Sequence, residues 1–140
     1  MGGFIDLHLH STFSDGTSSP EEVVRRSEDA GLSIISITDH DSVGGVPVAQ
    51  EAGKALGVEV IPGAELSANA EGRDIHILAY LVDWEHPEFV ACLRLYRERR
   101  KRRAKRMVKK LNRMGVGIRL DQVLAKAGDG AIGRPHLADV

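Results

Sequence analysis

The sequence predicts an α/β fold built on a mainly parallel sheet. Between residues 4 and 81, short apolar segments alternate with amphipathic stretches of about ten residues, which is the pattern of βαβ units. Polar, ligand-type side chains follow several of these segments, at the strand ends where parallel α/β sheets carry their sites. A chain of 140 residues with 42% hydrophobic content is large enough for one domain of ordinary size.

Four strands and two intervening helices are expected in this first part. The strands are expected at residues 4–10, 32–38, 58–62 and 74–81. Ser18 or Ser19 should cap the first helix, since proline and two glutamates follow in the first turn, and Gly31 should end it. The second helix is expected at 47–56, before Gly57.

The chain changes character near residue 83. We expect residues 1–82 to hold the βα units and residues 83–140 to form a mainly helical insertion, with a long helix at 87–114 and a shorter one at about 120–126. A stripe of apolar residues at helical spacing predicts the face of the long helix that packs on the sheet. Its members are Phe89, Leu93, Tyr96, Ala104, Met107, Leu111 and Met114.

Charge is strongly segregated along the chain, although the net charge is only −1. Residues 94–113 hold twelve Lys or Arg residues and one acid, Glu98. Such a segment indicates an anionic ligand, a nucleic acid or simply a well-solvated helix.

Two classes of protein are disfavoured by composition. No apolar run approaches the roughly twenty residues that span a bilayer, and the N-terminus lacks the pattern of a secretory signal. A single cysteine, Cys92, leaves no internal disulfide framework. We therefore expect a cytoplasmic protein without a membrane partner.

The segment DLHLHSTFSDG, residues 6–16, places two histidines at alternate positions of the first strand. His8 and His10 then share one face, where their imidazoles could bind one metal ion or two adjacent ions. Asp15 follows in the next loop. The alternative is an edge strand with two solvated histidines.

Further ligand-type residues accompany the other three strands. Asp39, His40 and Asp41 follow the second strand, Glu65 follows the third, and His76 lies inside the fourth. Taken singly, such an aspartate is often a helix cap and such a histidine a core residue. Four consecutive strands that each supply a ligand-type residue favour a metal site.

Five motifs, in this order, resemble the PHP (polymerase and histidinol phosphatase) family: His8-Leu9-His10-Ser11, Ser14-Asp15-Gly16, Thr38-Asp39-His40-Asp41, Pro62-Gly63-Ala64-Glu65, and His76. The segment Gly133-Arg134-Pro135-His136 is similar to the branch of small phosphoesterases that act on nucleoside 3′,5′-bisphosphates and short RNA ends. The resemblance implies the N-terminal portion of a distorted (β/α)7 barrel with a helical insertion. The family pattern continues with another His and an Asp-x-His pair, so we expect an N-terminal half whose metal site is incomplete alone.

The resemblance also implies a set of metal ligands: His8, His10, Asp15, His40, Glu65 and His76. They would hold two or three divalent metal ions, manganese first, with iron or zinc as alternatives, and mixed imidazole and carboxylate ligation suits these metals. Glu65 is the expected bridging ligand. Asp39 and Asp41 are expected to orient imidazole N–H groups.

Substrate phosphate is expected to bind Arg100, Arg103, Arg134 and His136. Arg100 and Arg103 lie within or beside the apolar stripe, where a guanidinium could reach over the metal site. The alternative is that both end in solvent, with their stems covering apolar surface.

The leading hypothesis is a metal-dependent phosphoesterase that hydrolyses phosphate esters by metal-activated water. Its expected substrate is small and phosphorylated, either a nucleoside 3′,5′-bisphosphate or a short RNA 5′ end, and no obligate protein partner is evident. An amidohydrolase-type metal hydrolase and a non-catalytic nucleic-acid-binding fragment are the alternatives.

Overall fold

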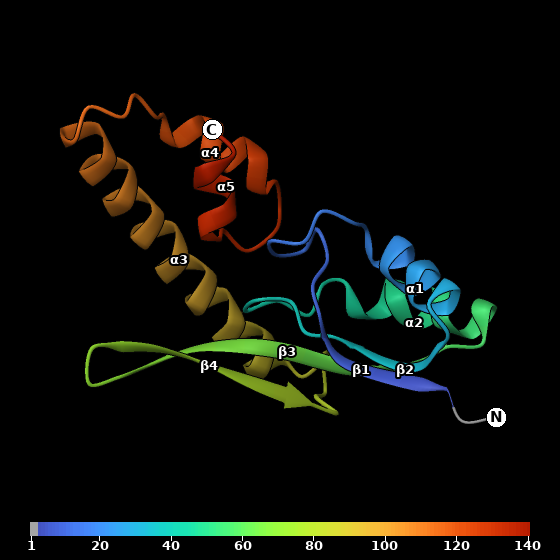
Figure 1. Ribbon diagram of the computed structural model, residues 1–140. Helices are drawn as coiled ribbons and strands as arrows, with labels where there is room; N and C mark the ends of the chain where they lie inside the picture. Colours follow the sequence, from blue (N-terminus) through green and yellow to red (C-terminus); the bar gives the residue numbers. More distant parts are fainter. Residues whose placement is uncertain (1–2) are drawn as a thin grey trace.

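This computed structural model describes residues 3–140. Nine helices and strands, joined by loops, lie within that range. They are, in order, β1 Phe4–Leu9, α1 Pro20–Asp29, β2 Leu32–Ile37, α2 Val46–Leu56, β3 Glu59–Ala70, β4 Arg73–Tyr80, α3 Pro87–Arg113, α4 Leu120–Ala127 and α5 Arg134–Ala138. Helices α1 and α2 lie together on one side of the sheet, and the long α3 leads away from it toward α4 and α5 (Figure 1).

The four strands form one sheet in the order β1-β2-β3-β4. The β1–β2 and β2–β3 pairs are parallel, as expected, but β3 and β4 are antiparallel. Strand β3 changes partner along its length, because residues 59–62 pair with β2 and residues 63–70 pair with β4. The prediction that the third strand ends before Glu65 is therefore wrong, since Glu65 lies inside β3.

Two local features shape β3, where it leaves β2 and where it turns into β4. Gly63 lies so close to β2 that a Cβ there would come within 2.3 Å of the Ser36 hydroxyl. Glu71 and Gly72 both have positive φ, 53° and 79°, which suits a two-residue hairpin turn whose twist matches that of the strands. The chain can thus turn back on itself instead of crossing over through a helix.

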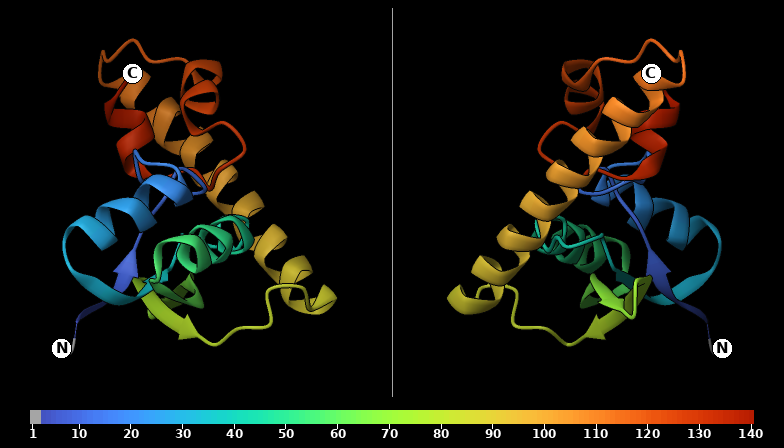
Figure 2. Two further views of the ribbon diagram at one scale, coloured as in Figure 1. Left: turned by 90° about the vertical axis from the view of Figure 1, so that its right-hand side faces the viewer. Right: turned by 90° about the vertical axis from the view of Figure 1, so that its left-hand side faces the viewer.

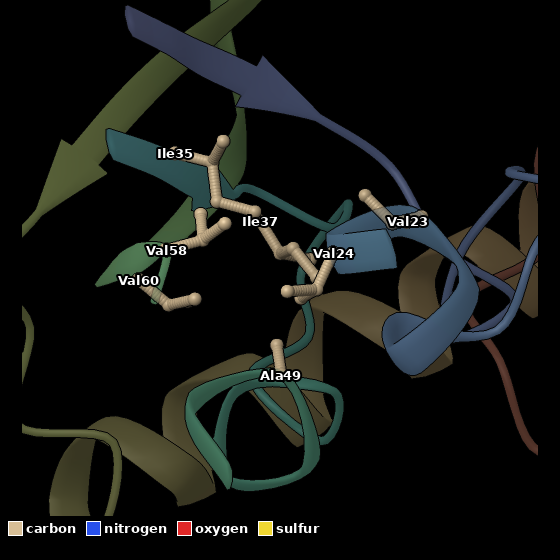
Figure 3. Packing of buried hydrophobic residues seen from close by; sticks show 7 residues of the cluster. All are labelled: Val23, Val24, Ile35, Ile37, Ala49, Val58 and Val60. Carbon is tan, nitrogen blue, oxygen red and sulfur yellow. The ribbon is translucent and has the colours of Figure 1, made fainter. Parts of the chain in front are cut away.

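The first hydrophobic core fills the space between the sheet and helices α1 and α2 (Figure 3). Its buried residues are Val23, Val24, Ile35, Ile37, Ala49, Val58 and Val60. The helix limits agree with the caps expected from the sequence: the Ser19 hydroxyl accepts the amide N–H of Glu22 at 3.3 Å, and Gly57 has the left-handed conformation that ends α2.

A second core joins the C-terminal half of α3 to the last two helices. It contains Ala104, Val108, Ile118, Val123, Ala127, Ile132 and Leu137. The apolar stripe of α3 was expected to face the sheet, and beyond Ala104 this is wrong. The C-terminal end of α3 extends away from the sheet and lies beside α4 and α5, and Met114 at that end is 69% exposed (Figures 1 and 2). The domain boundary near residue 83 stays a prediction.

The segment before α5 returns to the loop that follows β1. The amide of Ala131 donates to the carbonyl of Phe13 at 3.0 Å, and a Cβ on Gly130 would lie 2.7 Å from the carbonyl oxygen of Thr12. These contacts place the start of α5 next to the loop that follows β1. Among the described residues, no helix is both long enough and apolar enough to cross a membrane.

The first core predicts a specific cost of truncation. Ile35 is fully buried, so Ile35→Ala should lower the free energy of unfolding by about 2–5 kcal/mol. Ile77→Ala, at a strand position that is 50% exposed, is the matched control and should cost less than about 1 kcal/mol. Urea denaturation measures both, and equal losses would contradict the assignment of this core.

Candidate metal centre

The structure brings the six expected ligand residues to one end of the sheet. His8 is in β1, and His10 comes directly after that strand. His40 follows β2 and forms an isolated parallel bridge with Glu65 of β3. His76 of β4 and Asp15 of the loop after β1 complete the group.

The carboxylate of Glu65 lies at the centre, and its side chain is only 6% exposed. Its Oε2 atom is 3.1 Å from His8 Nε2, 3.0 Å from His10 Nε2 and 3.3 Å from His40 Nδ1. Its Oε1 atom is 2.5 Å from His76 Nδ1. One buried carboxylate thus contacts an imidazole from each of four different segments.

Asp15 extends the cluster on the other side of His10 and His40. Its two carboxylate oxygens lie 3.3 Å from His10 Nδ1 and 3.5 Å from His40 Nε2. The potential ligand atoms therefore form three overlapping groups, each with all of its atoms within 4.8 Å of one another. The groups are His8-His10-Glu65, His10-Asp15-His40 and His40-Glu65-His76. Ligands about 2 Å from a shared ion have such spacings, and the overlap suits two or three neighbouring ions.

One unsatisfied atom supports a metal here. Nδ1 of His40 is buried, and although Glu65 Oε2 lies 3.3 Å away, no atom among the described residues meets hydrogen-bond geometry with this nitrogen. Buried polar atoms are rarely left unpaired, and a ligated ion would satisfy this one. Four imidazoles and two carboxylates are also the donors that zinc, iron and manganese accept. The residues present therefore fit a divalent metal site.

The surroundings shift the pKa values of these groups in different directions. The hydrogen bond from His10 and the nearby His40 lower the pKa of Asp15 to about 2. Burial and the positive charge of Arg100 lower the pKa of His40 to about 4, so its imidazole is neutral and able to ligate near pH 7. Burial opposes protonation of His10, but Asp15 and Glu65 outweigh it and raise the pKa of that imidazole.

Two buried aspartates on either side of His40 hold the surrounding segments. Asp39 accepts the amide of Ser11 at 2.7 Å, and the hydroxyls of Ser11 and Ser14 at 2.6 Å each. The Ser14 hydroxyl also lies 3.2 Å from Nδ1 of His10, so Asp39 orients that ring through Ser14. Asp41 accepts the amide and hydroxyl of Ser67 at 2.8 and 2.7 Å. Both aspartates were expected to orient imidazole N–H groups. Asp39 does so through Ser14, whereas the side chain of Asp41 binds Ser67 and Arg100 instead.

An arginine-lined cleft of about 390 Å³ adjoins the cluster, between the β3–β4 hairpin and α3. The hairpin supplies Ser67, Asn69 and Asp74, and α3 supplies Tyr96, Arg99, Arg100, Arg102, Arg103 and Arg106. Ser67 pairs in register with His76, so the cleft begins beside a metal-ligand candidate.

Two of the four expected phosphate-binding residues reach a partly exposed carboxylate, and the other two are buried. Arg103 Nη1 and Arg134 Nη2 both approach Oδ2 of Asp74, at 3.4 and 3.3 Å. Arg100 is buried in contact with Asp41 and Ser67. The Nδ1 atom of buried His136 accepts the backbone N–H of Gly133 at 2.9 Å, which closes the turn that begins α5. Their role in binding phosphate stays a prediction.

The comparison with known protein families identifies the fold. The PHP domain family model matches residues 6–118. The chain belongs to the PHP domain family. This PHP domain is 41% identical over 133 residues to a 5′-3′ exoribonuclease of Haemophilus influenzae, a match over 95% of this chain and 48% of the relative. It is 35% identical over 112 residues to a 3′,5′-nucleoside bisphosphate phosphatase of Chromobacterium violaceum, over 80% of this chain and 39% of the relative.

Solved structures agree with this assignment. The PHP domain matches an amidohydrolase from Chromobacterium violaceum with bound sulfate and no metal, at a TM-score of 0.89 and 32% identity, over 96% of this chain and 48% of that one. A putative metal-dependent phosphoesterase from Bifidobacterium adolescentis matches at a TM-score of 0.88 and 36% identity, with the same coverage. The chain spans about half the length of the curated relatives it matches first. The α/β barrel portion expected from the sequence is confirmed by these matches.

Two serines of this PHP domain were not among the expected site residues. Ser14 lies between Asp39 and His10, and Ser67 lies between Asp41 and Arg100. A signal for Ser67 was present, because residues two apart in a strand share a face and Ser67 is two residues beyond Glu65. This signal for Ser67 was missed because the third strand was expected to end before Glu65.

The central position of Glu65 predicts the effect of its removal. Glu65→Gln keeps the side-chain shape but removes the charge that two of the three ligand groups share, so Mn²⁺ affinity should fall by at least about 100-fold. Glu59→Gln, at an exposed position of the same strand, is the control and should bind Mn²⁺ like the parent protein. Isothermal titration calorimetry measures both constants. Unchanged affinity in Glu65→Gln would contradict the shared-carboxylate arrangement.

Proposed function

We propose that this PHP domain carries the metal centre and substrate-binding residues of a metal-dependent phosphoesterase. The proposed substrates are nucleoside 3′,5′-bisphosphates or short RNA 5′ ends. The observation that carries the proposal is a ligand cluster able to hold neighbouring metal ions, directly beside a cleft lined by five arginines of α3. Neither feature alone distinguishes a phosphoesterase from other metal hydrolases, but together they supply metal-activated water and positive charge for a phosphate.

The proposed metals are manganese ions, with iron or zinc as alternatives, two or three in a complete site. When bound, such ions activate water and stabilise negative charge on phosphoryl oxygens. The chain's own contribution is to fix the ligands. Glu65 is buried among four imidazoles, and Asp15 stays ionised because its pKa is about 2. No covalent nucleophile from the protein is required.

The arginines beside the cluster supply an excess of positive charge for a phosphate. Burial and the charges of Arg100 and Arg134 lower the pKa of Arg103, which is the sign of crowded guanidinium groups. Arg103 and Arg134 share a single acceptor, Asp74, whose side chain is 46% exposed. An incoming phosphate offers more acceptor oxygens than this carboxylate and can take bidentate contacts from both guanidinium groups.

The relatives support this substrate class. A 41% identical protein is named a 5′-3′ exoribonuclease, and a 35% identical protein is named a 3′,5′-nucleoside bisphosphate phosphatase. The matched structure from Chromobacterium violaceum holds sulfate, a tetrahedral anion like phosphate. That structure is called an amidohydrolase, which keeps amide hydrolysis as the second candidate. The arginine-lined cleft favours the phosphate ester, because an uncharged amide gains little from five guanidinium groups.

The direct test uses a protein in which this PHP domain is followed by the later ligands that the family resemblance implies. It measures Mn²⁺-dependent phosphate release from adenosine 3′,5′-bisphosphate and nucleotide release from a 5′-phosphorylated short RNA. We expect activity with at least one substrate and its loss when EDTA removes the metal. Arg103→Met should raise KM about tenfold or more with a smaller change in kcat, because it removes a guanidinium that binds phosphate in the ground state.

The control is Lys105→Met, which removes a charge at an exposed position of α3 outside the cleft and should leave KM within twofold. Hydrolysis of N-acyl amides with no turnover of either phosphate ester would contradict the proposal and favour the amidohydrolase. An unchanged KM in Arg103→Met would remove Arg103 from the phosphate site.

A further inference from the structure

Arg100 is the one arginine of the described α3 whose guanidinium is buried inside the protein. The residue is only 5% exposed, while the other arginines of the helix are partly or fully exposed. Its Nε atom donates to the carboxylate of Asp41, and its Nη2 atom donates to the Ser67 hydroxyl at 2.7 Å. Its Nη1 atom faces the carbonyl of Ile132 at 3.4 Å. One side chain thus joins four segments: α3, the loop after β2, strand β3 and the segment before α5.

The partners of Arg100 are the immediate neighbours of metal-ligand candidates. Asp41 directly follows His40, and Ser67 lies two residues beyond Glu65 on the same face of β3. The backbone ties the same two segments together, because the amide of Asp41 donates to the carbonyl of Glu65 at 2.9 Å. A displacement of Asp41 or Ser67 would therefore change the distance between His40 and Glu65.

The local backbone needs this support. Asp41 has a φ of 50°, in the left-handed region that is costly for a residue other than glycine. Its side chain is fully buried and is held by the amide and hydroxyl of Ser67 and by Arg100. A conformation of this kind persists only where the surrounding contacts determine it.

The guanidinium of Arg100 already donates hydrogen bonds to Asp41 and Ser67. A buried ion pair adds little net stability compared with a well-packed apolar pair, so its value lies in fixing one arrangement of the groups around it. Arg103 and Arg134, which reach a partly exposed carboxylate, are placed better to meet a phosphate.

We propose that Arg100 is a positioning residue of the metal centre rather than a substrate ligand. Its guanidinium fixes the loop of His40 against the strand of Glu65, and it attaches helix α3 to both. The imidazole and the carboxylate then keep the spacing that neighbouring ions require. The part of this proposal that concerns metal affinity rests on the proposed function, and the part that concerns the loop does not.

Two variants and one control separate positioning from folding. Arg100→Lys keeps the charge but loses the fork that reaches Asp41 and Ser67 together. The double variant Arg100→Met, Asp41→Asn removes both charges, so no uncompensated charge is left buried. Lys105→Met, at an exposed position of the same helix outside the arginine-lined cleft, is the control.

The first readout is hydrogen exchange in the metal-free protein. We expect the amides of Asp41 and Ser67 to exchange at least about tenfold faster in both variants, while amides of the first core are unchanged. The second readout is the Mn²⁺ dissociation constant, which should rise about 10- to 100-fold in both variants and stay within twofold in Lys105→Met.

Unchanged exchange at Asp41 and Ser67 would overturn the proposal. So would a raised KM for a phosphate substrate with an unchanged Mn²⁺ dissociation constant, because that pattern belongs to a substrate ligand. If the parent protein binds no Mn²⁺, the proposed function fails, and the exchange rates still decide the role of Arg100.

Discussion

The buried carboxylate of Glu65 is the constraint on which the rest of the site depends. A charged group that is almost fully removed from water needs partners, and here four imidazoles surround it. Strand β3 places it there by pairing first with β2 and then with β4, so that Glu65 lies between His40 on one side and the hairpin that carries His76 on the other. The antiparallel turn of the sheet is therefore part of the construction of the site.

The two aspartates beside His40 bind different neighbouring segments. Asp39 binds the loop after β1 through Ser11 and Ser14, which sets the ring of His10. Asp41 binds β3 through Ser67 and reaches α3 through Arg100. Each segment that supplies a ligand is thus connected to the next by buried hydrogen bonds as well as by the sheet. The metal centre and the arginine-lined cleft meet at Ser67 and Arg100, so the helical insertion contributes to the cleft and supports the ligands at once.

The sequence predicted the strands and helices and the six clustered residues well, because both depend on local patterns. The Ser-Pro-Glu-Glu start of α1, the glycine that ends α2 and the alternation of His8 with His10 are short-range signals. It predicted less well wherever the outcome depends on contacts between distant segments. The continuation of β3 through Glu65 depends on pairing with β4, and the apolar face of α3 beyond Ala104 depends on α4 and α5. The burial of Arg100 could not be expected, since its partners lie 59 and 33 positions away in the sequence.

The account rests on Glu65 as a carboxylate shared between neighbouring metal ions, and anomalous X-ray scattering at the manganese edge tests this most directly. Crystals of a protein that holds this domain together with the later family ligands, grown with Mn²⁺, should show at least two anomalous peaks about 3.5–4 Å apart, with the carboxylate of Glu65 in contact with both. His40 should ligate through its Nδ1 atom, which has no hydrogen-bond partner among residues 3–140. A single peak that Glu65 does not contact, or peaks away from the imidazole cluster, would contradict the account.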